Sequence, residues 1–555
     1  MEQFINITPH PNTMKLKQVI PIIVAIILIG VVITVLTGPS TPEVEDDNQE
    51  TSDTGGETTD SGSETPDSGG ETTDTEGETT DTGSNSTDDT STEANMTMCL
   101  DIPPGISREY EIIRVEGEVN STITLDAGTI FGISANEYEW SQRFASMESL
   151  QYMSNHKLTI INPDNETATV NVTYPGVYRI ELAADGETYE MELKVTKEGK
   201  QLEVKGINFI DLFGETGGAE FNIYPDDPEC FQKALDHALA GPERAGVEWI
   251  GLVSGGFYSQ VDPPIIQDDD HYLSNSDEYF YGEFVEAAHS RGFKVMEMFQ
   301  DGPSIWFTPE QHQELAKKRQ TVEWWDHWYE EWEVFMLRRL EMAERHGVDA
   351  VVLLMFVETT LDPVYVPDSG AKWTDMIHNL REVYSGEIGI NFVNLDERFT
   401  FVEEVDFLEI TFFGGLWTSR VGAIANISEP SMEELMAIND DMFEGIGLYD
   451  SKGKPIYAVL TIDSTDAQYS TEDPALRTAT DFNEQVLYYE AFYTSVDEYD
   501  WIKGVITERW DYWDEYRRFS EEFDVQYFDE TNAASPRNKP AEDVVTLWHE
   551  IFRSP

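Results

Sequence analysis

Basic residues are scarce in this chain of 555 residues. Only 35 lysines and arginines stand against 107 aspartates and glutamates, which gives a formal net charge of −72 at pH 7. Nucleic acid is itself a polyanion, so it is not expected as a partner of such a surface. Salt screens the mutual repulsion of the carboxylates. The composition therefore favours neutral ligands, cations or a high-salt habitat.

The usual signals of several chemistries are also missing. Cys99 and Cys230 are the only cysteines, too few for a disulfide scaffold and without metal-site spacing, although outside the cell they could form one bond. The ten histidines include no H-E-x-x-H pattern or close cluster, and there is no G-x-S-x-G elbow. No cofactor and no metal ion are therefore expected.

Charge is absent from one long apolar run near the N-terminus, "VIPIIVAIILIGVVITVL", which has roughly the length that crosses a bilayer as a helix. Lys15 and Lys17 precede the run, which predicts a short cytoplasmic N-terminus over residues 1–18 and an uncleaved transmembrane anchor over 19–37. A cleaved signal peptide is the alternative, but no A-x-A-like site follows. We expect a single-pass protein of the cell membrane, with the bulk of the chain extracellular.

Residues 38–98 have almost no apolar side chains and repeat the phrase "GGETTD" in degenerate form. Such a segment cannot bury enough surface to offset its chain entropy, so it is predicted to be a disordered acidic stalk. Its threonines and serines suit O-glycosylation, and sequons for N-glycosylation occur at Asn85, Asn95, Asn120, Asn165, Asn171 and Asn426. The pattern favours an exported glycoprotein.

Short alternating runs such as "TATVNVTYPG", separated by Gly, Pro, Asn and Asp, fill residues 99–200. This rhythm predicts an all-β, immunoglobulin-like sandwich with a hairpin turn at Asp185 and Gly186. A spacer that holds the next domain away from the membrane is the simpler interpretation. Carbohydrate binding through Tyr138 and Trp140 is the alternative.

Strand and helix patterns alternate eight times over residues 201–555. The predicted strands begin with "GINFIDLF" and end with "WIKGVITERW", and the fourth is the long apolar run "DAVVLLMFVE", which ends on Glu358. Eight such units are what a (β/α)8 TIM barrel requires. A doubly wound sheet remains the alternative, although no glycine-rich phosphate loop favours it.

Carboxylates and aromatic residues gather at the predicted carboxyl ends of these strands, where the active site of such a barrel lies. This combination is typical of glycoside chemistry, because carboxyl groups protonate the leaving oxygen and attack, while rings stack on sugars. Glu409, like Glu297, lies inside its strand rather than at its end. The candidate carboxylate and amide residues are Asp211, Glu297, Glu358, Asn394, Asp463, Glu508 and Asp511, and the candidate aromatic residues are Tyr258, Trp417 and Trp510.

Several phrases resemble the clan A glycoside hydrolases, most closely the family 113 β-mannanase barrels and their TIM-barrel-like relatives. They cover the whole predicted barrel, with "IGINFVNLDE" similar to the fifth strand and "VDFLEITFFGGLW" to the sixth. "GKPIYAVLTIDS" is similar to the seventh strand, and "SPRNKPAEDVVTLWHEIF" to the closing helix. The resemblance implies a retaining mechanism, with an acid/base glutamate after strand four and a nucleophilic glutamate after strand seven.

The first of these roles carries over to Glu358, although Val357 stands where the family has asparagine. The second does not carry over directly, because Ile462 occupies the nucleophile position and Asp463 follows it. Either Asp463 serves, or Glu508 on strand eight replaces it, or the nucleophile is absent. The resulting hypothesis is a cell-surface hydrolase of a β-linked polysaccharide or oligosaccharide. A degenerate barrel that binds glycan or builds the cell envelope is the alternative.

Overall fold

The computed structural model describes residues 112–147, 149–209, 228–268, 278–303, 307–393, 395–413, 430–447, 451–464, 480–510 and 535–554. The described residues all belong to one compact unit, Met96–Pro555. The predicted membrane segment, the stalk and Cys99 lie outside the described residues, so those predictions and the Cys99–Cys230 bond stay predictions. Within the described ranges, no helix combines the length and the apolar character needed to cross a membrane.

The all-β region consists of two sheets. The first has the order β1 (Ile113–Glu118), β7 (Glu187–Thr196), β6 (Gly176–Ala184) and β3 (Tyr138–Arg143). The second has the order β2 (Thr122–Asp126), β5 (Thr167–Asn171) and β4 (Thr159–Ile161), and a short helix, α3 (Ala127–Phe131), follows β2. Side chains from both sheets, including Leu125, Val170 and Ile180, share one buried core. The region is therefore a sandwich of two sheets; its immunoglobulin-like character stays a prediction.

Two details of this sandwich bear on the sequence predictions. Asp185 and Gly186 join β6 to β7 with φ angles of 49° and 87°, as the predicted hairpin turn requires. Trp140 is only 2% exposed, and its indole Nε1 donates to the carbonyl of Asn165 at 2.9 Å. The suggestion that Trp140 is a platform for sugar is therefore wrong, because its ring belongs to the core.

Eight parallel strands form the second region and close on themselves. They are β8 (Val204–Phe209), β9 (Trp249–Gln260), β11 (Lys294–Pro303), β12 (Ala350–Val352), β13 (Glu387–Phe392), β14 (Phe407–Phe413), β15 (Ile456–Thr461) and β16 (Ile502–Thr507). Each pairs in parallel with the next, and β16 pairs with β8. A ninth strand, β10 (Ile265–Asp268), pairs antiparallel with the extended end of β9. The closed barrel confirms the TIM-barrel prediction and excludes the open, doubly wound sheet.

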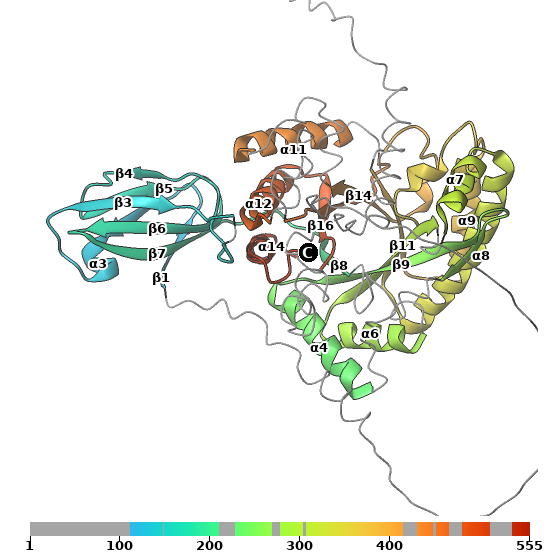
Figure 1. Ribbon diagram of the computed structural model, residues 1–555, viewed down its shortest axis with the longest axis horizontal. Coiled ribbons are helices and arrows are strands. Elements are labelled where there is room, and N and C mark those ends of the chain that lie inside the picture. The colour runs from blue at the N-terminus through green and yellow to red at the C-terminus, as the bar shows by residue number, and fades with distance from the viewer. Residues whose placement is uncertain are drawn as a thin grey trace, which may run out of the picture. The chain divides into compact units, whose positions relative to one another are not determined.

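Helices follow the strands, and Figure 1 shows α4, α6 and α8 outside the long strands β9 and β11. The described helices of this region are α4 (Pro228–Arg244), α6 (Glu278–Ser290), α7 (Pro309–Lys318), α8 (Val322–His346), α9 (Ser369–Leu380), α11 (Met432–Gly447), α12 (Phe482–Glu498) and α14 (Pro540–Ile551). Gly246, Gly292 and Gly347 follow α4, α6 and α8 with φ of 65°, 87° and 75°. Glycine ends these helices because it adopts that left-handed conformation without strain.

Side chains alternate between two cores, as the period of a strand requires. Met296 and Met298 of β11 point into the barrel with Val352 and Phe407. Their neighbours Val295 and Phe299 instead join the larger core between strands and helices. This phase decides for every polar strand residue whether it faces the barrel interior or the helices.

The fourth strand departs from its prediction. Its run "DAVVLLMFVE" was expected to be a strand up to Glu358, but β12 ends at Val352. Phe356 then takes a left-handed conformation with φ of 58° and ψ of 51°, and Val357–Thr360 form a short 3-10 helix, η2. Apolar composition predicted the burial of this segment correctly but not its path, because buried strands and buried turns share the same composition.

Candidate active site

Glu358 lies in η2, beyond the carboxyl ends of β12 and β13, and its carboxylate oxygen Oε1 accepts a hydrogen bond from the backbone N–H of Val393 at 2.7 Å. Thr360, two residues after Glu358, anchors the 3-10 helix to the outer layer. Its backbone carbonyl accepts from the Tyr329 hydroxyl at 3.1 Å, and the Thr360 hydroxyl accepts from the Trp373 indole at 2.9 Å. The carboxylate is thus mounted on a short helix that α8 and α9 hold in place.

A cationic side chain lies near this carboxylate. Arg398 binds both carboxylate oxygens of Asp396, with Nε at 2.9 Å from each and Nη2 at 2.7 Å from one. Burial opposes the charge of Arg398, but the hydrogen bonds to Asp396 and the negative charges of Asp396 and Glu358 outweigh it, so the pKa of the guanidinium is raised. The surroundings of Glu358 therefore include a fixed positive charge in a chain that is otherwise strongly acidic.

A second carboxylate, Glu508, faces the barrel interior from the end of β16. Ile506 lies in the interior core and Val505 in the outer one, so the period of two directs Glu508 inward. Its backbone N–H donates to the carbonyl of Leu460 at 2.9 Å, and its carboxylate accepts from the hydroxyl of Thr461. Burial raises the pKa of Glu508, although the Thr461 hydroxyl opposes the shift.

Glu409 of β14 is the most deeply enclosed interior carboxyl group, with no exposed surface. Asn391 of β13 donates to it from Nδ2 at 3.3 Å and to the hydroxyl of Thr411 at 2.8 Å. Burial raises the pKa of Glu409 to about 8, and the charge of Glu508 adds to this effect. At neutral pH the interior therefore holds a protonated carboxyl group beside Glu508.

Asp463, the other candidate for the strand-seven role, follows the end of β15 and is exposed. Ile462, at the position where the resembling family has its nucleophile, is fully buried. The charges of Glu508 and Asp463 both raise the pKa of Tyr489 on α12, after the larger effect of burial. Both carboxylates thus belong to the same side of the barrel, but Glu508 is buried there and Asp463 is exposed.

Two other predicted site residues point away from the interior. Glu297 binds Arg339 of α8 and accepts from the hydroxyls of Ser254 and Tyr281 at 2.7 Å each. Tyr258 is fully buried, donates to Asp301 and accepts from the Trp328 indole at 3.2 Å. These contacts lie between strands and helices, so both residues support the outer layer rather than reach a ligand at the barrel mouth.

Trp510 also points away from the barrel mouth, because of a turn in the backbone. Arg509 turns the chain with φ of 62°, and the Trp510 ring then packs beside Gly241 of α4, where it has no exposed surface. A fully buried ring cannot stack on a sugar, which corrects the role predicted for it. The remaining predicted substrate contacts lie outside the described residues: Asp211, Asn394, Trp417 and Asp511.

Sequence reasoning passed over the interior residues Asn391 and Thr411 and gave Glu409 no role. A usable signal was present, because "GINF" and "FLEITFF" are apolar strands interrupted by polar residues at alternate positions. Polar groups inside a closed barrel are costly unless they are hydrogen-bonded or functional. The phase of each strand, set by Phe407 in the interior, was needed to recognise them.

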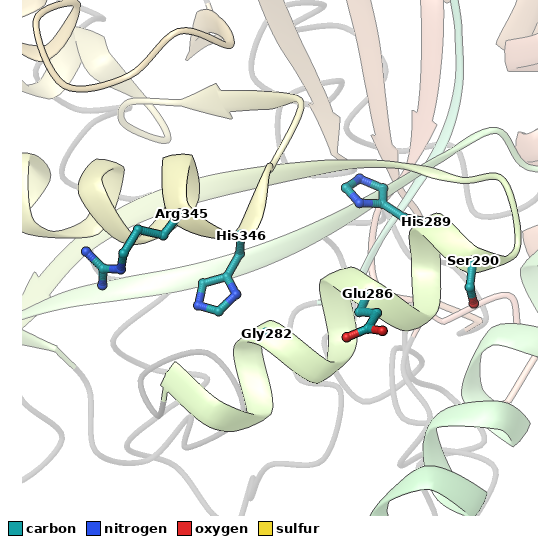
Figure 2. A pocket seen from close by; sticks show the side chains of 6 residues that line it. All are labelled: Gly282, Glu286, His289, Ser290, Arg345 and His346. Atoms are coloured by element: carbon teal, nitrogen blue, oxygen red, sulfur yellow. The ribbon is translucent and has the colours of Figure 1, made fainter.

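A separate hollow of about 510 Å³ lies on the outside, between α6 and the end of α8. Figure 2 shows its lining, in which the side chains of His289 and His346 come from different helices. His289 contacts Asp349 at 3.0 Å, and Arg345 binds Glu278. Ligands of this fold bind at the carboxyl ends of the strands, so the hollow is not the candidate active site. Across the described ranges, no cluster of three or more metal-binding side chains occurs.

Several solved structures of glycoside hydrolases are similar to this chain. Among solved structures, a GH113 β-1,4-mannanase in complex is 15% identical, with a TM-score of 0.43, and the match covers 63% of this chain and 99% of that one. A GH113 β-mannanase from Alicyclobacillus acidocaldarius is 18% identical, with a TM-score of 0.41 and coverage of 63% and 98%. A β-glucuronidase from Ruminococcus gnavus is 12% identical, with a TM-score of 0.40 and coverage of 74% and 67%.

No curated protein sequence matches the chain. The model of Glycoside Hydrolase Family 113 matches residues 231–528, which is more than half of the chain and spans most of the barrel. The chain therefore belongs to glycoside hydrolase family 113, and the protein is a glycoside hydrolase.

Proposed function

We propose that this protein hydrolyses a β-linked polysaccharide, with Glu358 as general acid and base and Glu508 as the second carboxylate. The observation that carries the proposal is the hydrogen bond from Val393 N–H to Glu358, which holds a carboxylate beyond the ends of strands four and five. That is the end of the barrel at which such enzymes act. Because a similar structure of the same family is a β-1,4-mannanase, β-1,4-linked mannan is the first substrate to test.

The proposed reaction proceeds by retention. Glu358 gives its proton to the glycosidic oxygen while the carboxylate of Glu508 attacks the anomeric carbon, so the bond to the leaving sugar breaks as a glycosyl ester forms. Glu358 then removes a proton from water, which attacks the same carbon and releases Glu508. Glu508 is preferred to Asp463 for the second role because its carboxylate is buried and accepts from the Thr461 hydroxyl, whereas Asp463 is exposed.

Location at the cell surface is part of the same proposal. Its support is the apolar run over residues 19–37, followed by an acidic stalk that would extend by self-repulsion. Brief protease treatment of intact cells should release the barrel region, and a membrane pellet should retain the full-length chain. Recovery of the full-length chain in the soluble fraction would contradict this part of the proposal.

A screen of β-linked polysaccharides with the wild type, Glu358→Gln, and the control Glu403→Gln tests the enzymatic proposal. Glu403 is an exposed residue of η3 (Val402–Glu404), so its substitution removes one charge without altering the interior. Glu358→Gln should lower turnover by about 10²- to 10⁴-fold, as expected for loss of a positioned proton donor. NMR of the first product tests retention, since an inverted anomer would assign a different role to the second carboxylate.

A glycan-binding or structural barrel is the second candidate, and the burial of Ile462 at the nucleophile position favours it. Under this alternative the protein would bind polysaccharide in a pull-down but release no sugar from it. Equal hydrolysis by the wild type and Glu358→Gln would remove Glu358 from the mechanism, and no hydrolysis by the wild type would favour the binding role.

A further inference from the structure

Every second residue from Gly389 to Val393 forms a hydrogen bond with the segment 353–358, which carries Glu358. The carbonyl of Gly389 accepts from Leu353 N–H at 3.0 Å, and the N–H of Asn391 donates to the carbonyl of Leu354 at 3.3 Å. The N–H of Val393 then reaches the Glu358 carboxylate at 2.7 Å. Because β12 has already ended at Val352, these contacts replace the regular ladder and set the path of the chain up to Glu358.

Phe356, on this path, has an unfavourable backbone conformation. Its φ of 58° is uncommon for a residue with a large side chain, and such a conformation persists only where its surroundings enforce it. The side chain of Asn391 supplies one such contact, since its Oδ1 accepts from the N–H of Phe356 at 3.3 Å. Two residues later the chain reaches Glu358, so a change at Phe356 displaces the carboxylate directly.

The orientation of the Asn391 amide follows from its partners. A backbone N–H can only donate, so the oxygen of the amide must face Phe356. The Nδ2 group then faces β14, where it donates to the hydroxyl of Thr411 at 2.8 Å and to Glu409 at 3.3 Å. Asn391 therefore joins two interior side chains of strand six to the turn that precedes Glu358.

We propose that Asn391 is a positioning residue for Glu358, and that Thr411 and Glu409 hold its amide in the required orientation. Asn391 is fully buried and acts through the backbone of Phe356 rather than through contact with substrate. This inference rests on the proposed function, in which Glu358 is the acid and base. A shift of about 1 Å in a catalytic group can lower turnover by about 100-fold, so this support is large enough to measure.

The test compares two leaving groups. Asn391→Leu has nearly the same size but cannot accept from Phe356 or donate to Thr411. We expect its kcat on the polysaccharide to fall by about 100-fold with KM changed by less than about twofold, since only the proton donor is misplaced. On a 2,4-dinitrophenyl β-glycoside, whose leaving group needs no proton, kcat/KM reports the first step alone and should fall by less than about 10-fold, against about 100-fold on the polysaccharide.

Two further variants make the comparison specific. Thr411→Val keeps the shape of the side chain and removes one partner of the amide, so it should show the same split between substrates, but smaller. Tyr493→Phe is the matched control, because it removes a buried hydrogen bond to Thr507 at 3.0 Å in the outer layer. Its activity should change equally on both substrates. Equal losses of kcat/KM on both substrates for Asn391→Leu would overturn the positioning role.

A crystal structure of Asn391→Leu, or of Thr411→Val if the first variant does not fold, separates this inference from the proposed function. We expect Phe356 to leave the left-handed region and Glu358 to lose its 2.7 Å contact with Val393. An unchanged Glu358 in the variant would refute the positioning role whatever the activity. An inactive wild type with a displaced Glu358 in the variant would instead refute the proposed function alone.

Discussion

Two glutamates of this barrel have no exposed surface, yet their surroundings differ completely. Glu297 of β11 faces the helices, where Arg339, Ser254 and Tyr281 all bind its carboxylate. Glu409 of β14 faces the interior, where one Asn391 amide at 3.3 Å is its hydrogen-bond donor and burial raises its pKa to about 8. Burial alone therefore does not identify a functional carboxyl group; its side of the strand and its partners do.

Glu508 shares the interior with Glu409, so its substitution should lower kcat more than any other substitution considered below. If interior carboxyl groups perform the chemistry, Glu508→Gln should lower kcat by more than about 10⁴-fold, because it removes the nucleophile of the proposed covalent step. Asp463→Asn should change kcat by only a few fold, because Asp463 is exposed. Steady-state kinetics on the best polysaccharide measures both. A larger loss for Asp463→Asn would transfer the role of second carboxylate to strand seven.

The outer carboxyl group should instead affect stability. Arg339→Met removes the cation that balances Glu297, while Glu297 stays buried without it, and breaking such a pair typically costs about 3–5 kcal/mol. Glu297→Gln combined with Arg339→Met should recover much of this loss, because no charge is then left buried. Urea denaturation at pH 7 measures the free energy of unfolding for each variant. A double variant as unstable as Arg339→Met alone would show that packing, not charge, dominates at this site.

The sequence predicted where the barrel strands lie better than where each strand ends. All eight barrel strands were located, because each is a short apolar run followed by a helical pattern and several helices end on glycine. The fourth was assigned too long, because residues 353–356 are as apolar as a strand but leave the sheet through a left-handed Phe356. That turn depends on Asn391, 35 residues later, so no local pattern indicates it.

The candidate site was predicted less completely, for a related reason. Glu358 and Glu508 were selected because they follow apolar runs, and their catalytic roles stay predictions. Glu297, Tyr258 and Trp510 were selected from the same strand segments but point outward or pack away from the mouth. A shift of one residue in phase exchanges the two faces of a strand. The direction of each side chain became known only once neighbouring strands and helices were in place.

The smallest expected effect concerns the pH dependence of stability. The pKa of Glu409 is raised to about 8 in the folded protein from an ordinary value of 4.5, so the folded state binds the proton more tightly than the unfolded state. The contribution of Glu409 is therefore fully present below about pH 4.5 and is lost as the pH rises through about 8. Each pKa unit corresponds to about 1.4 kcal/mol at full effect. Relaxation and water penetration around a buried charge lower that cost, so we expect a net loss on the order of 2 kcal/mol.

Glu409→Gln removes this titration while keeping a neutral group of similar shape in the interior. Its free energy of unfolding, relative to the wild type, should therefore rise between pH 5 and pH 8, whereas the exposed control Glu403→Gln should show no such trend. Urea denaturation across this pH range measures the difference, and subtraction of the wild type cancels groups common to both proteins. A constant difference between Glu409→Gln and the wild type would mean that the Glu409 carboxyl group is already balanced, as Glu297 is by Arg339.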